Sequence, residues 1–199
     1  PNRKPDVLAI LTNVLVHLHN WRRNLPKKIQ VDYAKEKLDV KRHIANLHCE
    51  YFQCINLTVR PILLYFVRQR LLTAKKGAAN VLKSSSSPPA KRRCTMAPPP
   101  VDLSHYSQEM LALLSATFQA SIQTIRSLQH LYAHHELPLF SYFDREYITS
   151  SVSTLLLFNA AFGVNAFAMT RVSAGLKLLE AMADGGNIKA EDRRDNLLG

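Results

Sequence analysis

Residues 147–170 read YITSSVSTLLLFNAAFGVNAFAMT, the longest stretch of the chain without a charged side chain. Glu146 precedes this stretch and Arg171 follows it. About 20 apolar residues are enough to span a bilayer, so the stretch is long enough to cross a membrane. Its content favours a protein core instead, because Ser, Thr and Asn side chains recur along it. The stretch therefore predicts a buried central helix, and a membrane anchor at residues 147–170 is the alternative.

Composition indicates a folded domain with a sizeable core. The chain has 199 residues, of which 47% are apolar, and this is enough for one domain. Its three cysteines, Cys49, Cys54 and Cys94, are odd in number and form no Cys-x-x-Cys pair. This spacing argues against a disulfide framework or a zinc site within the chain and favours a reducing compartment. We expect the thiols of Cys49 and Cys54 to be buried.

The positive charge is concentrated in the first half of the chain. Residues 1–101 carry 19 Lys and Arg against 5 Asp and Glu, whereas residues 102–199 carry 7 against 10. A basic half is typical of proteins with an acidic partner such as nucleic acid. No pattern of stacking aromatics accompanies these basic residues. We therefore favour solvated helix faces and a basic linker over a nucleic-acid surface.

Apolar residues recur every three or four positions over most of the chain, and no segment alternates with the period of a strand. The predicted fold is all-α, an irregular bundle of about six helices with a disordered linker inserted in it. The other predicted helices cover residues 7–21, 40–72, 103–132 and 165–184, with a last helix after Asn187. Pro61 predicts a kink or a short break in the second of these helices, and the third is long enough to bend near Ala120.

The first helix should begin after Asp6 and bury a stripe of residues at helical spacing. The members of this stripe are Val7, Leu11, Val14, Leu18 and Trp21, and Leu8 and Leu15 widen it. The sequence Asn24-Leu25-Pro26 should end the helix, because proline lacks a backbone donor and disfavours a helical conformation in the residue before it.

Residues 74–101 differ in composition from the rest of the chain, since they are rich in Ser, Pro and basic residues. Such a segment cannot bury enough apolar surface to offset the entropy of ordering it. We expect a disordered linker here, inserted between residues 1–73 and 102–199 of one helical domain. Lys91, Arg92 and Arg93 are a candidate nuclear-import patch, although ordinary linker charge explains them as well.

No motif for catalysis or cofactor binding is present in the sequence. It lacks a glycine-rich phosphate loop, a Gly-x-Ser-x-Gly elbow and a His-Glu-x-x-His pair. Asp144 and Glu146 lie two positions apart and point in different directions on a helix, so we interpret them as acids favoured by the helix dipole. We predict that the chain is not an enzyme and that it holds no metal or cofactor.

One ligand site is nevertheless conceivable in the uncharged stretch. Phe158, Asn159, Phe162 and Asn165 combine large apolar side chains with polar anchors, as an apolar pocket requires. Asn159 and Asn165 are six residues apart and cannot share one face of a helix, so at most one should serve as an anchor. The alternative is that each asparagine bonds to neighbouring backbone within the core.

Four short patterns follow one another along the chain. They are Leu18-x-x-Trp21-Arg22-x-x-Leu25-Pro26; Leu47-His48-x-x-Tyr51 followed by Arg60-Pro61-x-Leu63; Phe140-x-x-Phe143-x-x-x-Tyr147; and Leu178-Leu179-x-x-Met182-Ala183-Asp184-x-Gly186-Asn187-x-x-Ala190-x-x-Arg193. In this order they resemble the C-terminal part of the fungal-specific transcription factor domain, the middle homology region of zinc binuclear-cluster regulators. The resemblance covers most of residues 6–198 apart from the linker.

This resemblance implies an all-α regulatory domain of a nuclear protein. Zinc and DNA would be bound by a six-cysteine cluster that this chain lacks, in another part of a longer protein. The implied partners are the transcription machinery, the protein's own DNA-binding region, a small apolar effector or a second copy of the chain, and no membrane is implied. No family site residue carries over to this sequence.

Overall fold

The structure, a computed structural model, describes residues 6–84 and 101–199, except for the side chains of residues 77–84. These residues form six α-helices and one 3₁₀ turn, with no strand among them, so the all-α prediction is confirmed. The elements are α1 (Val7–Arg23), η1 (Lys27–Ile29), α2 (Arg42–Ser84), α3 (Gln108–Ala133), α4 (Tyr142–Phe162), α5 (Ala166–Asp184) and α6 (Ile188–Leu198).

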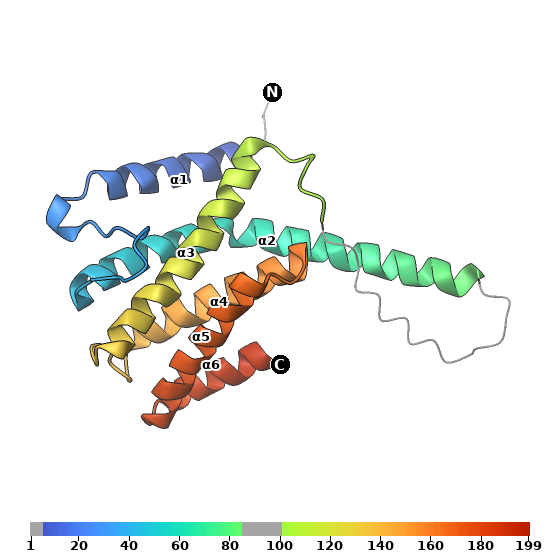
Figure 1. Ribbon diagram of the computed structural model, residues 1–199. Helices are drawn as coiled ribbons and strands as arrows, with labels where there is room; N and C mark the ends of the chain where they lie inside the picture. The colour runs from blue at the N-terminus through green and yellow to red at the C-terminus, as the bar shows by residue number, and fades with distance from the viewer. Residues whose placement is uncertain (1–5, 85–100) are drawn as a thin grey trace.

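Three helices form the centre of the bundle, since α2, α3 and α4 each pack against the other two. α1 covers α2 and α3 on one side, and α5 and α6 lie on the other side (Figure 1). α5 contacts both α4 and α3, whereas α6 contacts α5 and α4. One continuous set of buried apolar residues joins all six helices.

The uncharged stretch is divided between two helices: the predicted central helix ends at Phe162, and α5 begins close to the start of the helix predicted over residues 165–184. α4 ends at Gly163, whose φ of 95° lies in a region that glycine adopts far more readily than other residues. Asn165 then caps α5. The first part of the stretch is buried as predicted, with Ile148, Val152 and Leu155 fully enclosed. In the part of the chain that the structure describes, no helix is long and apolar enough to cross a membrane.

α1 buries one side of the predicted stripe and leaves the other side exposed. Leu15 is buried and Leu8, Leu11 and Leu18 are partly buried, whereas Val7 is 65% exposed. The other two members of the predicted stripe that face outward are Val14 and Trp21. Apolar residues occur on both sides of this helix, so spacing alone could not tell which side meets α2 and α3. The predicted cap is confirmed, because the Asp6 carboxylate accepts a hydrogen bond from the Leu8 amide at 3.0 Å.

α2 is longer than the sequence predicts and is continuous through Pro61, so the expected short break does not occur. Its two halves run in different directions in Figure 1. The helix continues to Ser84, so the linker predicted from residue 74 overlaps the end of α2 over residues 74–84. The rest of that linker, residues 85–100, lies outside the described residues.

α3 begins later than predicted and does not break near Ala120. Its cap is Ser107, whose hydroxyl accepts a hydrogen bond from the Met110 amide, and neither Asp102 nor Ser104 serves as a cap although both are of a residue type that often does. Asp102 instead accepts a hydrogen bond from the Ser104 amide, which forms a turn before the helix. Local side-chain bonds of this kind compete with helix formation and delay its start.

The two cysteines within the described residues differ in environment. Cys49 is buried, as predicted, and burial raises its pKa far above the ordinary value. Cys54 is exposed, so the prediction of a second buried thiol is wrong. The two residues are five positions apart and therefore lie on nearly opposite sides of α2. Only one of those sides faces the core.

Candidate functional site

Phe158 and Phe162, two residues of the predicted apolar pocket, pack into a row of aromatic rings. The Phe158 ring lies edge-on to that of Phe118 in α3, with 5.1 Å between centroids. The Phe162 ring lies 5.2 Å from that of Phe66 in α2, and Phe66 contacts Tyr106 at 5.0 Å. Aromatic pairs at these separations stabilise a core. Both side chains thus hold α2, α3 and α4 together.

Asn159 and Asn165 meet at the corner between α4 and α5. The Asn165 amide donates to Oδ1 of Asn159 at 3.0 Å, and Nδ2 of Asn159 lies 3.1 Å from Sδ of Met169. Oδ1 of Asn165 accepts from the Ala168 amide as the cap of α5. Both asparagines therefore bond to neighbouring groups, which is the alternative that the sequence left open. A pocket at these residues stays a prediction, and the cavities described next lie elsewhere.

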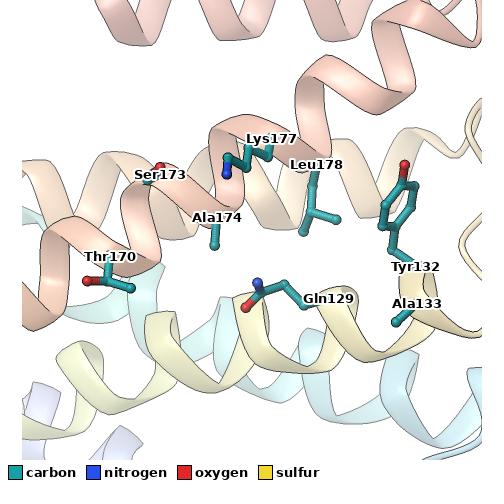
Figure 2. A pocket seen from close by; sticks show the side chains of 8 residues that line it. All are labelled: Gln129, Tyr132, Ala133, Thr170, Ser173, Ala174, Lys177 and Leu178. Carbon is teal, nitrogen blue, oxygen red and sulfur yellow. The ribbon is translucent and has the colours of Figure 1, made fainter.

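The largest cavity described in the structure is an open groove between α3 and α5, with a volume of about 660 Å³. Figure 2 shows the two helices facing one another, with side chains from both directed into the space between them. We call it the α3–α5 groove. Its lining residues are Gln129, Tyr132, Ala133, Thr170, Ser173, Ala174, Lys177 and Leu178.

Beside the α3–α5 groove, Gly175 of α5 packs tightly against α4 and α3. A Cβ atom on Gly175 would lie 2.4 Å from Cγ2 of Val152 and 3.1 Å from Cδ1 of Ile125. Glycine is therefore required on the inner side of α5, while Ser173 and Ala174 beside it are too small to fill the outer side. Sequence reasoning missed this site, although the run of small residues at positions 173–175 was a usable signal.

The α3–α5 groove is basic. Lys177 is exposed at its edge, and no acidic side chain lines it. Arg171 borders the groove and donates a hydrogen bond to Oε1 of Gln129 at 3.1 Å. The Nε atom of Arg171 is buried and has no hydrogen-bond partner among the described residues. Burial, together with the positive charge of Arg126, lowers the pKa of Arg171. An occupant that supplies a negative charge or acceptor oxygens would complement the exposed ammonium group of Lys177.

The chemistry of the lining favours binding over bond-making. The hydroxyls of Thr170, Ser173 and Tyr132 are present, but no His, Asp, Glu or Cys lines the groove beside them. A hydroxyl nucleophile requires an adjacent general base. The hydroxyl of Thr170 also donates to the backbone carbonyl of Ala166 at 3.0 Å. The groove can thus hold an occupant by hydrogen bonds and apolar contact.

A second cavity, of about 520 Å³, lies at the end of α1 and is lined in part by His19, Arg22 and His48. The Arg22 guanidinium lies over the rings of Tyr33 and Tyr51 at 5.4 and 5.6 Å from their centroids. Such contacts hold a cation against aromatic faces. Nδ1 of His19 lies 2.6 Å from the Tyr51 hydroxyl. We call His19, Arg22, Tyr33, His48 and Tyr51 the Arg22 cluster. It joins α1 to α2.

His48 is the most enclosed member of the Arg22 cluster, with 1% of its surface exposed. Its Nε2 atom lies 3.0 Å from the carbonyl oxygen of Ile29, and its Nδ1 atom has no partner among the described residues. Burial is the main cause that lowers the pKa of His48, and burial also lowers that of His19. Both rings are therefore harder to protonate than a free imidazole, and they line the cavity beside Arg22 and Arg23.

The first two patterns behind the family resemblance meet in the Arg22 cluster. The Trp21 ring stacks on that of Tyr51 with 5.8 Å between centroids. Arg22 reaches the same Tyr51 ring, and Tyr51 packs against Phe52 at 5.3 Å. Twenty residues of sequence, 27–46, separate the two patterns. The structure places them in direct contact.

The last two patterns meet at the start of α4 and the turn before α6. Nδ2 of Asn187 donates to the backbone carbonyl of Leu139 at 2.8 Å, and its Oδ1 accepts from the Ala190 amide. Arg193 forms a salt bridge with Glu146 at 3.2 Å. Tyr147 of the third pattern donates a hydrogen bond to Glu50 of α2, so each of the four patterns supplies a contact between helices.

Lys91, Arg92 and Arg93, the candidate nuclear-import patch, lie outside the described residues. Asp144 and Glu146 point in different directions, as predicted. Asp144 is fully buried against Arg42, and Glu146 contacts Arg145 and Arg193. No group of three or more potential metal-binding side chains occurs within residues 6–76 and 101–199.

The chain was compared with protein families, curated proteins and solved structures, and none of them matches it.

Proposed function

We propose that this chain is the regulatory domain of a fungal transcription regulator and that it does not itself contact DNA. It controls activity by binding a segment of its own protein, a partner protein or a small molecule. In this proposal, zinc and DNA are bound by another part of the protein, which acts in the nucleus.

The observation that carries this proposal is the α3–α5 groove. Its lining offers hydrogen-bonding side chains, the positive charge of Lys177 and two small residues, Ala133 on α3 and Ala174 on α5. Grooves between packed helices are common sites for segments that bring apolar and polar contacts together. The groove is open at the surface and can therefore admit a peptide as well as a small molecule.

Contacts between the four patterns support the transcription-factor part of the proposal. In the first and second patterns, Trp21 and Tyr51 pack together. Tyr147 of the third pattern donates a hydrogen bond from its hydroxyl to Glu50 of α2, and Arg193 of the fourth pattern forms a salt bridge with Glu146 of α4. The resemblance therefore rests on residues that hold this arrangement of helices together. Residues with such roles are expected to recur among proteins that share a fold.

A reporter assay tests the regulatory role directly. The chain is placed between a heterologous DNA-binding domain and an activation domain in yeast, and reporter output is compared with that of the same fusion lacking the chain. We expect the chain to change the output several-fold. Ser173→Trp fills the groove and Lys177→Glu reverses its charge, so each should remove that change. Ala112→Trp, at an exposed position on α3 outside the groove, is the matched control.

Two results would contradict the proposal. The first is that the chain leaves the reporter output unchanged, or that the Ser173→Trp and Ala112→Trp chains change it equally. Circular dichroism must show in this case that all variants are folded. The other is sequence-specific binding of duplex DNA by the isolated chain in the presence of excess competitor DNA. Weak binding that disappears as salt is raised would reflect only the net charge of +11.

A further inference from the structure

α2 has a second apolar face that no described residue covers. Leu57, Leu64 and Leu71 are 52%, 51% and 57% exposed, and they are spaced seven residues apart. Tyr65 and Leu72, also seven apart, lie beside them and are 53% and 42% exposed. We call these five residues the outer leucine face. Residues at such spacing form one stripe along a helix, here about 21 Å long.

The opposite side of the same helix is the one that enters the core. Ile55, Val59, Leu63 and Phe66 are all nearly or completely buried against the other helices. The outer leucine face is therefore not an edge of the core stripe but a separate surface. A contiguous exposed patch of large apolar side chains marks an interaction site in a protein. Leucines at seven-residue spacing are typical of a face that packs against another helix.

Positive charge surrounds the outer leucine face. Arg68 and Lys75 are both exposed, and Arg68 lies between Leu64 and Leu71 on the helix surface. No ion pair to Arg68 or Lys75 is found among the described residues. Two other arginines of this half of α2 are held inward, since Arg60 donates to the Ser150 hydroxyl and Arg70 donates to backbone carbonyls at the end of α4.

The chain itself does not supply a complementary charge for this surface. Residues 51–101 include no Asp or Glu, so neither α2 beyond Glu50 nor the segment that follows it can neutralise the basic residues. Residues 1–5 are likewise without an acid. Pairing of two copies through this face would bring two entirely basic helix segments together. Like charges placed side by side oppose such pairing.

We propose that the outer leucine face binds an acidic amphipathic helix of a partner protein. Leucines of that helix pack between Leu57, Leu64 and Leu71, and its Asp and Glu side chains pair with Arg68 and Lys75. This surface lies on α2 and shares no residue with the α3–α5 groove. The inference therefore goes beyond the proposed function and does not depend on it.

Fluorescence anisotropy with labelled peptides tests the proposal. The acidic probe is a helical peptide of about three heptads with leucine at the a and d positions and glutamate at the e and g positions. The basic probe has lysine in place of every glutamate. We expect the 199-residue chain to bind the acidic probe and not the basic one. Affinity should fall as salt is raised, because exposed charge pairs are screened.

Two variants separate the apolar and the charged contributions. Leu64→Ser with Leu71→Ser should weaken binding of the acidic probe by at least about tenfold, because buried anchors dominate such interfaces. Arg68→Glu with Lys75→Glu should abolish binding of the acidic probe and create binding of the basic one. Lys35→Glu with Lys37→Glu makes the same change in net charge at exposed positions away from α2. This control should leave both affinities unchanged.

Three outcomes would overturn the proposal. In the first, the acidic probe binds no more tightly than the basic one. In the second, light scattering shows a dimer that Leu64→Ser with Leu71→Ser dissociates, so that a second copy covers the face. In the third, duplex DNA binds in a manner that depends on Arg68 and Lys75 but not on the leucines. The reporter result with Ser173→Trp is independent of all three.

Discussion

Arg42 at the start of α2 holds Asp144 at the start of α4 through two hydrogen bonds, with N–O distances of 3.0 and 2.6 Å. The Asp144 side chain is fully buried, whereas that of Arg42 is 27% exposed. The residues are 102 positions apart in the sequence. This salt bridge joins the two halves of the domain, and its two partners differ in their access to water.

That difference predicts unequal effects of removing each partner. Arg42→Met leaves a buried carboxylate without its counter-ion and should lower the free energy of unfolding by about 3–5 kcal/mol. Asp144→Asn leaves an arginine that water can reach, and the loss should be about 1–2 kcal/mol. Urea unfolding followed by circular dichroism measures both. Lys189→Met, which removes an exposed pair with Asp192, is the control and should have little effect. Equal losses for Arg42→Met and Asp144→Asn would contradict this interpretation.

Gly175→Ala should destabilise the domain by about 1–3 kcal/mol, because the added methyl group overlaps Val152. Alanine is the better helix former, so a stabilising result would mean that α5 and α4 can separate without loss. Val152→Ala in the Gly175→Ala protein should recover part of the stability. A double-mutant cycle from thermal or urea unfolding measures the coupling between the two positions. Simple additivity of the two changes would disprove the steric explanation.

His135 lies two residues after the end of α3 and has a φ of 58°. This conformation costs a non-glycine residue free energy. The Glu136 amide bonds to the carbonyl of Leu131 at 2.8 Å, which is the pattern of a helix that closes through a left-handed residue. His135→Gly should therefore raise the free energy of unfolding by about 0.5–1 kcal/mol. His134→Gly is the matched control, because His134 has a φ of −102° and gains nothing from glycine. An equal effect of both changes would exclude the backbone explanation.

The free energy of unfolding should decrease as the pH is lowered, and His48 should account for part of that decrease. Burial holds the pKa of His48 below its ordinary value of 6.5, so the unfolded chain takes up a proton that the folded chain refuses. Above that value neither state is protonated, and below it the free energy of unfolding falls. The slope contributed by one such histidine is at most about 1.4 kcal/mol per pH unit.

His48→Gln can keep the contact with the Ile29 carbonyl but cannot take up the proton. The variant should show a shallower decline in the free energy of unfolding between about pH 7 and pH 5. Urea unfolding at a series of pH values measures the slope in both proteins. Carboxylates contribute in both, so the difference between the slopes isolates His48. Parallel slopes would mean that His48 is protonated equally in the folded and unfolded states.

Much of the fold could be predicted because helix signals are local. The caps at Asp6 and Asn187, the end of α1 at Asn24 and the turn at Gly186 each depend on a few neighbouring residues. The absence of any period-two segment excluded strands for the same reason. The burial of the residues from Ile148 to Leu155 followed from their lack of charge.

The candidate site could not be predicted in the same way. The α3–α5 groove depends on how far apart two helices lie, and the close approach of Gly175 in α5 to Ile125 in α3 and Val152 in α4 limits that distance. The prediction that at most one of Asn159 and Asn165 is an anchor assumed that both residues lie on one helix. The corner at Gly163 places them on different helices and brings them into contact.

The sequence by itself determined that this protein is helical, where most of its helices begin and end, and how its charge divides along the chain. Only the tertiary structure decided which apolar faces are covered. α1 and α2 each carry apolar residues on both sides, and hydrophobic spacing is the same whether a face is buried or exposed. The choice depends on packing with distant segments, such as the contact between Arg42 and Asp144, because burial is a property of the assembled bundle and not of any one helix.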